Sequence, residues 1–455
     1  MNYPYFNPTP GRLPLVALLP NLGSEAPEDH VCSYMDYISI NCAIMSMSVS
    51  KITTGINTAK DNNIRTILAH NHFNPEASRT LDQQLKYCQD TVNAHTKNTG
   101  LAGYWVGAFP QVNMEVENIE KFPEKIYDCD NGKSVFTMIP AHTAERSYTP
   151  NDYTDFIKEV QNKMKPAVWI ADSIPYNIIE GWVGIRHKEF LNSLETFAML
   201  SRYTLRPFWA SVKCGPDNEL LPYPTSGQML YHALSALAYG AKGIIFNNFR
   251  QKIKSDVPLA PLDYDGFETE QLDDVKKVIE RIKKFEQIFL SSQMMQIAHT
   301  GRKDLPSNQS ALNDVPLTER TEDSSILYRK FLSPIGPLYK ISCTGRGVLI
   351  SHLCWKPNDP ESSKDNTESS KDNTETTNDN NEPKNDVEDY LMIVNHDTDK
   401  KQTVTLSFSP YFKIEQVKSA KVNESIENDE IIITQSGSDT KIILDPGDCA
   451  IFRWK

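Results

Sequence analysis

Residues 206–251, RPFWASVKCGPDNELLPYPTSGQMLYHALSALAYGAKGIIFNNFRQ, have the pattern of a strand, a loop, a helix and a second strand. Arg206–Cys214 is a short apolar and aromatic run, which is typical of a buried strand. Between Ser226 and Tyr239, apolar residues recur at helical spacing on one face. Gly240 follows, where a helix end favours a residue that tolerates positive φ. Ile244–Phe246 is then a fully apolar strand, so the stretch predicts one βαβ unit of a parallel sheet.

The same alternation of strand and helix patterns extends over about 290 residues, slightly more than the ~250 of a typical (β/α)8 barrel. An open doubly wound sheet is the alternative, but no Gly-x-Gly-x-x-Gly motif follows the first strand. We therefore predict an α/β fold in which residues 1–293 form a (β/α)8 TIM barrel. The eight predicted strands are 13–19, 37–44, 64–69, 101–106, 135–139, 167–171, 206–214 and 244–249.

From residue 294 to 455 the pattern changes to short β-rich runs separated by polar turns, which predicts an antiparallel β-sandwich. Asp445–Asp448 has the composition of a type II turn between the last two strands. Residues 357–386 interrupt this domain with nine Asp or Glu and three Lys, and contain the heptad SSKDNTE twice. This insert has nothing apolar to bury and is predicted to be disordered.

Composition excludes several classes of function. The formal net charge is −12, of which the acidic insert supplies −6. No basic patch favours a nucleic-acid partner. The eight cysteines are scattered without a Cys-x-x-Cys pair, which indicates neither a disulfide framework nor a zinc site. No apolar run reaches the ~18 residues of a membrane span, and the first residues lack the features of a signal peptide. We expect a soluble chain without a cofactor, and its localisation stays open.

Two groups of residues resemble barrel glycoside hydrolases and glycoside-hydrolase-like proteins. The first combines Phe208-Trp209 with the run Ala236–Gly243, ALAYGAKG. The second, Val394–Asp397 and Leu444–Asp448, is similar to the C-terminal β-sandwich of these proteins. The resemblance covers nearly the whole chain and implies an oligosaccharide or polysaccharide partner.

One motif of the family is altered. Relatives commonly end the fourth strand with Gly-Tyr, three further residues and Asp-Glu-Pro, in which the Glu is the general acid. The matching residues here are Gly103–Pro110, GYWVGAFP, with Ala108 and Phe109 at the two carboxylate positions. Because phenylalanine cannot donate a proton, the resemblance implies weak or lost hydrolysis.

Glycoside hydrolysis needs two carboxyl groups, ~5–5.5 Å apart for retention and ~6.5–9.5 Å apart for inversion. Asp172 is the one carboxylate directly at a predicted strand end and is the candidate catalytic residue. The competing interpretation is a helix cap or an ion pair that holds the next loop. Four other carboxylates lie further out on loops, where a solvated charge is the simpler interpretation: Glu145, Glu180, Asp217 and Glu219.

The other strand ends offer candidate carbohydrate-binding residues. His70 and His72, at i and i+2, would share one face of a strand, but with no third ligand in view we predict no metal site. Lys213 could form a Schiff base, although no flanking motif supports that chemistry. Amides suit sugar hydroxyl pairs and aromatic rings suit pyranose faces, but aromatic residues near barrel strands also form core. The predicted binding residues are His70, His72, Trp105, Tyr176, Trp209, Lys213, Asn247 and Asn248, and Trp182 is a further stacking candidate.

Three hypotheses follow. The first is a carbohydrate-binding protein on a glycosidase frame, with little or no hydrolysis. The second is an active glycosidase in which Asp172 works with a loop carboxylate. The third is a non-enzymatic interaction protein whose sandwich and acidic insert contact other proteins.

Overall fold

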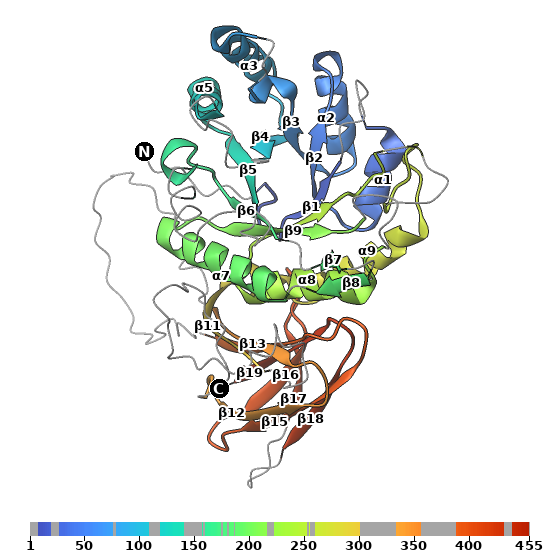
Figure 1. The fold of residues 1–455 in the computed structure, drawn as a ribbon, viewed down its shortest axis with the longest axis vertical. Coiled ribbons are helices and arrows are strands. Elements are labelled where there is room, and N and C mark those ends of the chain that lie inside the picture. Colours follow the sequence, from blue (N-terminus) through green and yellow to red (C-terminus); the bar gives the residue numbers. More distant parts are fainter. Residues whose placement is uncertain are drawn as a thin grey trace, which may run out of the picture.

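Eight parallel strands close into a barrel, which confirms the predicted (β/α)8 architecture (Figure 1). The computed structural model describes residues 8–19, 27–75, 79–108, 119–140, 157, 160–173, 176–179, 182–185, 187–215, 223–252, 254, 260–300, 334–355, 388–431 and 439–454. The strands follow one another around the barrel in chain order, and the last pairs with the first. They are β1 (Leu15–Leu18), β2 (Cys42–Ser46), β3 (Arg65–Ala69), β4 (Leu101–Ala108), β5 (Ser134–Pro140), β6 (Trp169–Asp172), β9 (Phe208–Lys213) and β10 (Ile244–Asn247).

Helices surround the barrel, and one of them alters a predicted strand. Residues 29–37 form a helix that buries Val31, Cys32 and Met35, so the second strand begins at Cys42 rather than at 37. Pro123 lies in the first turn of the helix Lys121–Cys129, where a backbone without an N–H is tolerated. The helices are α1 (Asp29–Tyr37), α2 (Ile52–Asp61), α3 (Leu81–His95), α5 (Lys121–Cys129), α7 (His187–Thr204), α8 (Ser226–Ala238), α9 (Glu270–Lys283) and α10 (Glu286–Ser291), with short 3-10 turns η1 (Val49–Lys51) and η2 (Asn71–Phe73).

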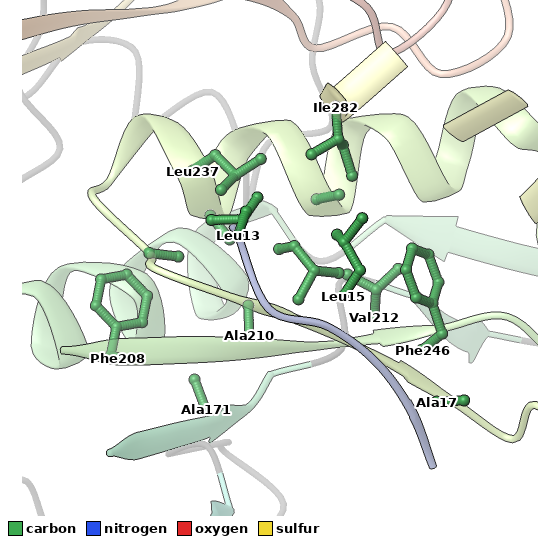
Figure 2. Close-up of a cluster of buried hydrophobic side chains, with 14 of the residues drawn as sticks. Leu13, Leu15, Ala17, Ala171, Phe208, Ala210, Val212, Leu237, Phe246 and Ile282 are labelled. Atoms are coloured by element: carbon green, nitrogen blue, oxygen red, sulfur yellow. The ribbon is translucent and has the colours of Figure 1, made fainter. Parts of the chain in front are cut away.

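The outward-facing strand residues pack against the helices and form the main core. Figure 2 shows Leu15 of β1, Val212 of β9 and Phe246 of β10 beneath Leu237 of α8 and Ile282 of α9. These side chains are 0 or 1% exposed. The alternating strand residues point inward and form a separate inner cluster that fills the barrel.

A short antiparallel hairpin, which the sequence analysis did not predict, interrupts the alternation after β6. It consists of β7 (Tyr176–Ile179) and β8 (Trp182–Ile185), in which Tyr176 pairs with Ile185. The hairpin therefore follows the carboxyl end of a barrel strand, the side on which barrels of this type carry their sites.

The C-terminal part is a two-sheet antiparallel sandwich, as predicted. One sheet has the order β11-β13-β14-β19-β16-β17 and the other β12-β15-β18. Their facing residues bury a second core that includes Leu338, Ile393 and Phe452. The acidic insert lies outside the described residues. The strands are β11 (Ser292–His299), β12 (Leu338–Cys343), β13 (Val348–Trp355), β14 (Glu388–Asn395), β15 (Gln402–Phe408), β16 (Ile414–Ser419), β17 (Glu427–Ile431), β18 (Thr440–Leu444) and β19 (Cys449–Trp454).

Helix α8 lies between the barrel and the sandwich (Figure 1). Its N-terminus has a capping box in which Thr225 and Gln228 bond reciprocally, at 3.2 and 3.0 Å. From Met229 to Ala238, every residue except Leu230 is buried, so the helix is covered around its whole circumference. A helix that is apolar on all sides has no face for water, and here the second face packs on the sandwich strands β13 and β14.

The predicted turn at Asp445–Asp448 packs directly against helix α8. The amide of Asp448 donates to the Asp445 carbonyl at 3.1 Å, and Gly447 has φ +65°. A Cβ on Gly447 would collide with the carbonyl oxygen of Gly227 in α8, and a Cβ on Gly227 would collide with the Thr398 carbonyl. Backbone therefore meets backbone here, which requires glycine on both sides.

An arginine on α9 reinforces this contact. Arg281 Nε donates to Asp448 Oδ1 at 2.6 Å, and its Nη2 donates to the Cys449 carbonyl at 2.6 Å. Nearby, Ser351 Oγ of β13 donates to the Ala238 carbonyl at 2.7 Å. Since α9 and α8 both belong to the barrel, these bonds tie the sandwich to it directly.

Candidate functional site at the barrel mouth

Four polar side chains meet at the carboxyl ends of three adjacent strands, and we call them the mouth cluster: Asp172, Ser211, Lys213 and Asn247. Ile170, Trp209 and Ile245 belong to the inner cluster. Residues two or four positions further along the same strands point to the same side. Asp172 therefore follows Ile170 at the end of β6, Ser211 and Lys213 follow Trp209 on β9, and Asn247 follows Ile245 on β10.

Strand register brings these groups together. Asn247 is directly opposite Lys213 in the β10–β9 pair, and Ala171 is opposite Ala210 in the β6–β9 pair. The Asn247 amide donates to Ser211 Oγ at 3.2 Å. Ser211 was not among the predicted residues, although the period-2 pattern from Trp209 to Lys213 places it on the inward face.

Lys213 has an altered basicity. Burial lowers the pKa of its ammonium to about 8 from an ordinary 10.5, the charge of Asp172 raises it, and the charge of Lys252 lowers it. Burial outweighs the attraction of the carboxylate, because removing an ammonium from water disfavours its charged form. The mouth therefore contains an amine whose pKa of about 8 lies well below the 10.5 of an ordinary lysine.

Asn248 does not join the cluster. Its backbone is left-handed, with φ +61°, and its amide donates to the Gly215 carbonyl at 3.3 Å. Asparagine tolerates this conformation better than most residues. This bond connects Asn248 to the loop after β9, and its carbohydrate-binding role stays a prediction.

The two tryptophans occupy different depths. Trp209 is 0% exposed, stacks on Phe136 at 5.4 Å and packs so closely on Gly243 that a Cβ there would lie 2.7 Å from its ring. This burial corrects the expectation that Trp209 stacks on a sugar. Trp209 is part of the core that fills the barrel. Trp105 is 7% exposed and pairs with Ala69, the last residue of β3, so it borders the mouth.

The paired histidines are not on a strand face, because β3 ends at Ala69 and η2 begins at Asn71. His70 Nδ1 accepts the backbone N–H of His72 at 3.0 Å, and burial lowers the pKa of His70 to about 4. His72 Nδ1 lies 2.8 Å from Thr91 Oγ1 on α3, and its ring stacks on Tyr87. The ring of His72 therefore faces the helix layer rather than the mouth, which corrects the expectation of a shared strand face. Within the described ranges, no three potential ligands are grouped for a metal ion.

A buried histidine that was not among the predicted residues lies near Lys213. His232 of α8 is 0% exposed and contacts Phe190 edge-on at 5.0 Å. Burial lowers its pKa to about 3. It is therefore a neutral core residue at physiological pH.

Several predicted residues lie outside the described side chains. Ala108 is the last residue of β4 and pairs with Met138, whereas Phe109 follows it outside the described residues. The four loop carboxylates and the side chains of Tyr176 and Trp182 are outside as well. Among the barrel strands as described, Asp172 is the one carboxylate at a carboxyl end.

All eight cysteines are described, and none of them forms a disulfide. No helix in the described ranges combines the length and apolar character that a bilayer crossing requires.

The sequence matches no protein-family model and no curated protein. Solved structures do match. A glycoside hydrolase is 10% identical, with 97% of this chain and 92% of that chain covered and a TM-score of 0.53. A family 5 glycoside hydrolase from Bacteroides vulgatus is 8% identical, with 97% and 88% covered and a TM-score of 0.52.

The chain spans about 60% of the length of a β-galactosidase from the psychrophilic Marinomonas ef1, with 60% of this chain covered, 9% identity and a TM-score of 0.44. At these identities the likeness concerns the fold alone. The chain therefore has the fold of the two glycoside hydrolase structures that match over 97% of its length.

Proposed function

We propose that the barrel mouth binds carbohydrate and that hydrolysis is weak or lost. The observation that carries this proposal is the mouth cluster itself, which has one carboxylate, one hydroxyl, one amide and one ammonium on three adjacent strands. Glycoside hydrolysis needs a second carboxyl group across the scissile bond. The other described strand ends supply none, and the sequence has Phe109 where relatives have a general acid.

The cluster has the chemistry that sugar hydroxyl groups require. The Asp172 carboxylate accepts hydrogen bonds only, whereas the amide of Asn247 both donates and accepts. Each hydroxyl of a vicinal diol donates one hydrogen bond and accepts up to two, so a diol matches this combination. Trp105, on β4 at another part of the mouth, supplies an apolar ring.

Glycan-array binding followed by calorimetry on a positive glycan tests the proposal. Asp172→Asn should weaken binding roughly 10- to 100-fold, because a hydrogen bond to a charged group contributes about 1.5–3 kcal/mol. Asn247→Ala should cost roughly 3- to 10-fold. Asn93→Ala, on the exposed face of α3, is the matched control and should change nothing.

If no glycan binds the wild type, the proposal is wrong and the interaction-protein hypothesis remains. In that case the sandwich and the acidic insert become the surfaces to test with protein partners.

An active glycosidase is the second candidate, since Asp172 is placed where barrel enzymes keep catalytic groups. An activated aryl glycoside distinguishes the two functions. Cleavage by the wild type that Asp172→Asn abolishes would establish the enzyme. Cleavage that persists in Asp172→Asn would exclude Asp172 as its catalytic carboxylate.

A further inference from the structure

Two lysines of the barrel have a lowered pKa of about 8, in both cases mainly because burial disfavours the charged amine, but they lie in different surroundings. Lys242 lies before β10, and its ammonium donates to the carbonyl oxygens of Phe289, at 2.7 Å, and Ser292. Its role is to hold the end of α10 against the barrel. Lys213 instead stands at the carboxyl end of β9, in the mouth cluster, where its side chain is partly exposed.

We propose that Lys213 is a carbonyl-binding nucleophile, which forms a Schiff base with the open-chain form of an aldose or another small hydroxyaldehyde. Its position supports this assignment. The lysine points into the mouth from a rigid strand, Asp172 is the charged acceptor on the adjacent strand, and Ser211 with Asn247 supplies hydroxyl and amide groups beside them.

The chemistry balances without a cofactor. The neutral amine of Lys213 attacks the carbonyl carbon, and one proton passes from the nitrogen to the carbonyl oxygen to give a neutral carbinolamine. The carbinolamine hydroxyl then takes up one proton from the solvent and leaves as water while the nitrogen lone pair forms the C=N bond, which gives a protonated Schiff base. Asp172 is the nearby carboxylate that can relay these protons and pair with the cationic product. Hydrolysis reverses every step and restores the amine.

The surroundings of Lys213 make its amine, rather than the neighbouring Cys214 thiol, the reactive nucleophile. Burial raises the pKa of the Cys214 thiol, so it stays protonated and inert. The positive charge of Lys252 disfavours a second ammonium at Lys213. A lysine that is desolvated and adjacent to another cation is the arrangement that activates an amine as a nucleophile.

This inference goes beyond the proposed function, because it requires neither glycan affinity nor hydrolysis. A small hydroxyaldehyde reaches the amine without filling the rest of the mouth. Absence of glycan binding would therefore leave it unaffected, and failure of the amine chemistry would leave the proposed function standing.

Reductive trapping tests it. The full-length protein is incubated at pH 7 with limiting glycolaldehyde and sodium cyanoborohydride, and labelled lysines are located by peptide mass spectrometry. With a pKa of about 8 against 10.5, Lys213 has roughly 300-fold more neutral amine at pH 7 than a surface lysine. An amine with a lower pKa is also a weaker nucleophile, which reduces this ratio. We therefore expect Lys213 to be labelled at least about 30 times faster than a surface lysine.

Lys242 is the internal comparison, since it has the same basicity but lies outside the mouth. Labelling of Lys213 should be much faster than labelling of Lys242, and its rate should rise with a midpoint near pH 8. Lys213→Arg keeps the positive charge but cannot form the adduct, and should lose only this label. The proposal is overturned if Lys213 reacts no faster than the exposed lysines, or only as fast as Lys242.

Discussion

Replacing Gly447 by alanine should weaken the attachment of the sandwich to the barrel. Two costs add together. An L-residue at φ +65° costs about 1–2 kcal/mol relative to glycine. The new methyl group would also collide with the Gly227 carbonyl and lie 2.8 Å from the Tyr231 amide nitrogen, and overpacking of this kind costs about 1–3 kcal/mol more.

Gly11→Ala separates the two costs. Gly11 has φ +75°, but nothing lies within 4 Å of the position its Cβ would take. The free energy of unfolding of Gly11→Ala should therefore fall only by the conformational cost, about 1–2 kcal/mol. The expected loss for Gly447→Ala is about 2–5 kcal/mol, and the excess over Gly11→Ala measures the collision with α8.

Urea unfolding followed by tryptophan fluorescence and far-UV circular dichroism provides both values. We expect the two signals to change together in the wild type, because one continuous core contains residues of the barrel and of the sandwich. In Gly447→Ala the two signals should separate, because the helices that dominate circular dichroism belong to the barrel whereas Trp355 and Trp454 of the sandwich contribute to the fluorescence. Equal losses in the two variants would refute the backbone-to-backbone contact as a source of stability.

Three further outcomes are expected. Arg281→Met removes both bonds to the Asp448–Cys449 segment and leaves a partly buried carboxylate, so its free energy of unfolding should fall by about 2–4 kcal/mol. His232→Gln should remove a pH dependence: the unfolded imidazole takes up a proton below pH 6.5 whereas the folded one does so near pH 3, so lowering the pH from 7 to 5 should cost the wild type about 2 kcal/mol more than the variant. Restoring the two missing carboxylates with Ala108→Asp and Phe109→Glu should create hydrolysis of an aryl glycoside, if their absence is what limits catalysis.

Each of these outcomes has a control. Lys277→Met breaks an exposed ion pair with Asp274 at 2.9 Å and should change stability by less than about 1 kcal/mol. A parallel pH titration of wild type and His232→Gln that gives the same slope would contradict a neutral buried imidazole. Unchanged inactivity of the doubly substituted protein, with sugar binding retained, would show that the loss of catalysis has another cause.

The barrel could be predicted because its strands are buried on both faces, and such strands are recognised as short apolar runs. The second strand was displaced because the residues before it, Asp29–Tyr37, form a helix with a weak apolar stripe. The hairpin of β7 and β8 was missed for a related reason. Its strands are four residues each, too short for an alternating pattern to emerge.

The site was partly predictable. Asp172, Lys213 and Asn247 follow apolar strands directly, so their place at the mouth could be inferred from the sequence. Ser211 was missed because it lies within the strand rather than at its end. Only the alternation of side chains along the strand shows that it points inward. The depth of Trp209 and the direction of His72 depend on Gly243 and on α3, which are distant in sequence, and no local pattern contains that information.

The burial of α8 on all sides limits how this chain can be divided. A barrel prepared without residues from β11 onward would present Tyr231 and its neighbours to solvent, and an isolated sandwich would uncover Met392 and Val394. Either fragment would be prone to self-association, so future dissection of the protein is better served by point substitutions than by truncation.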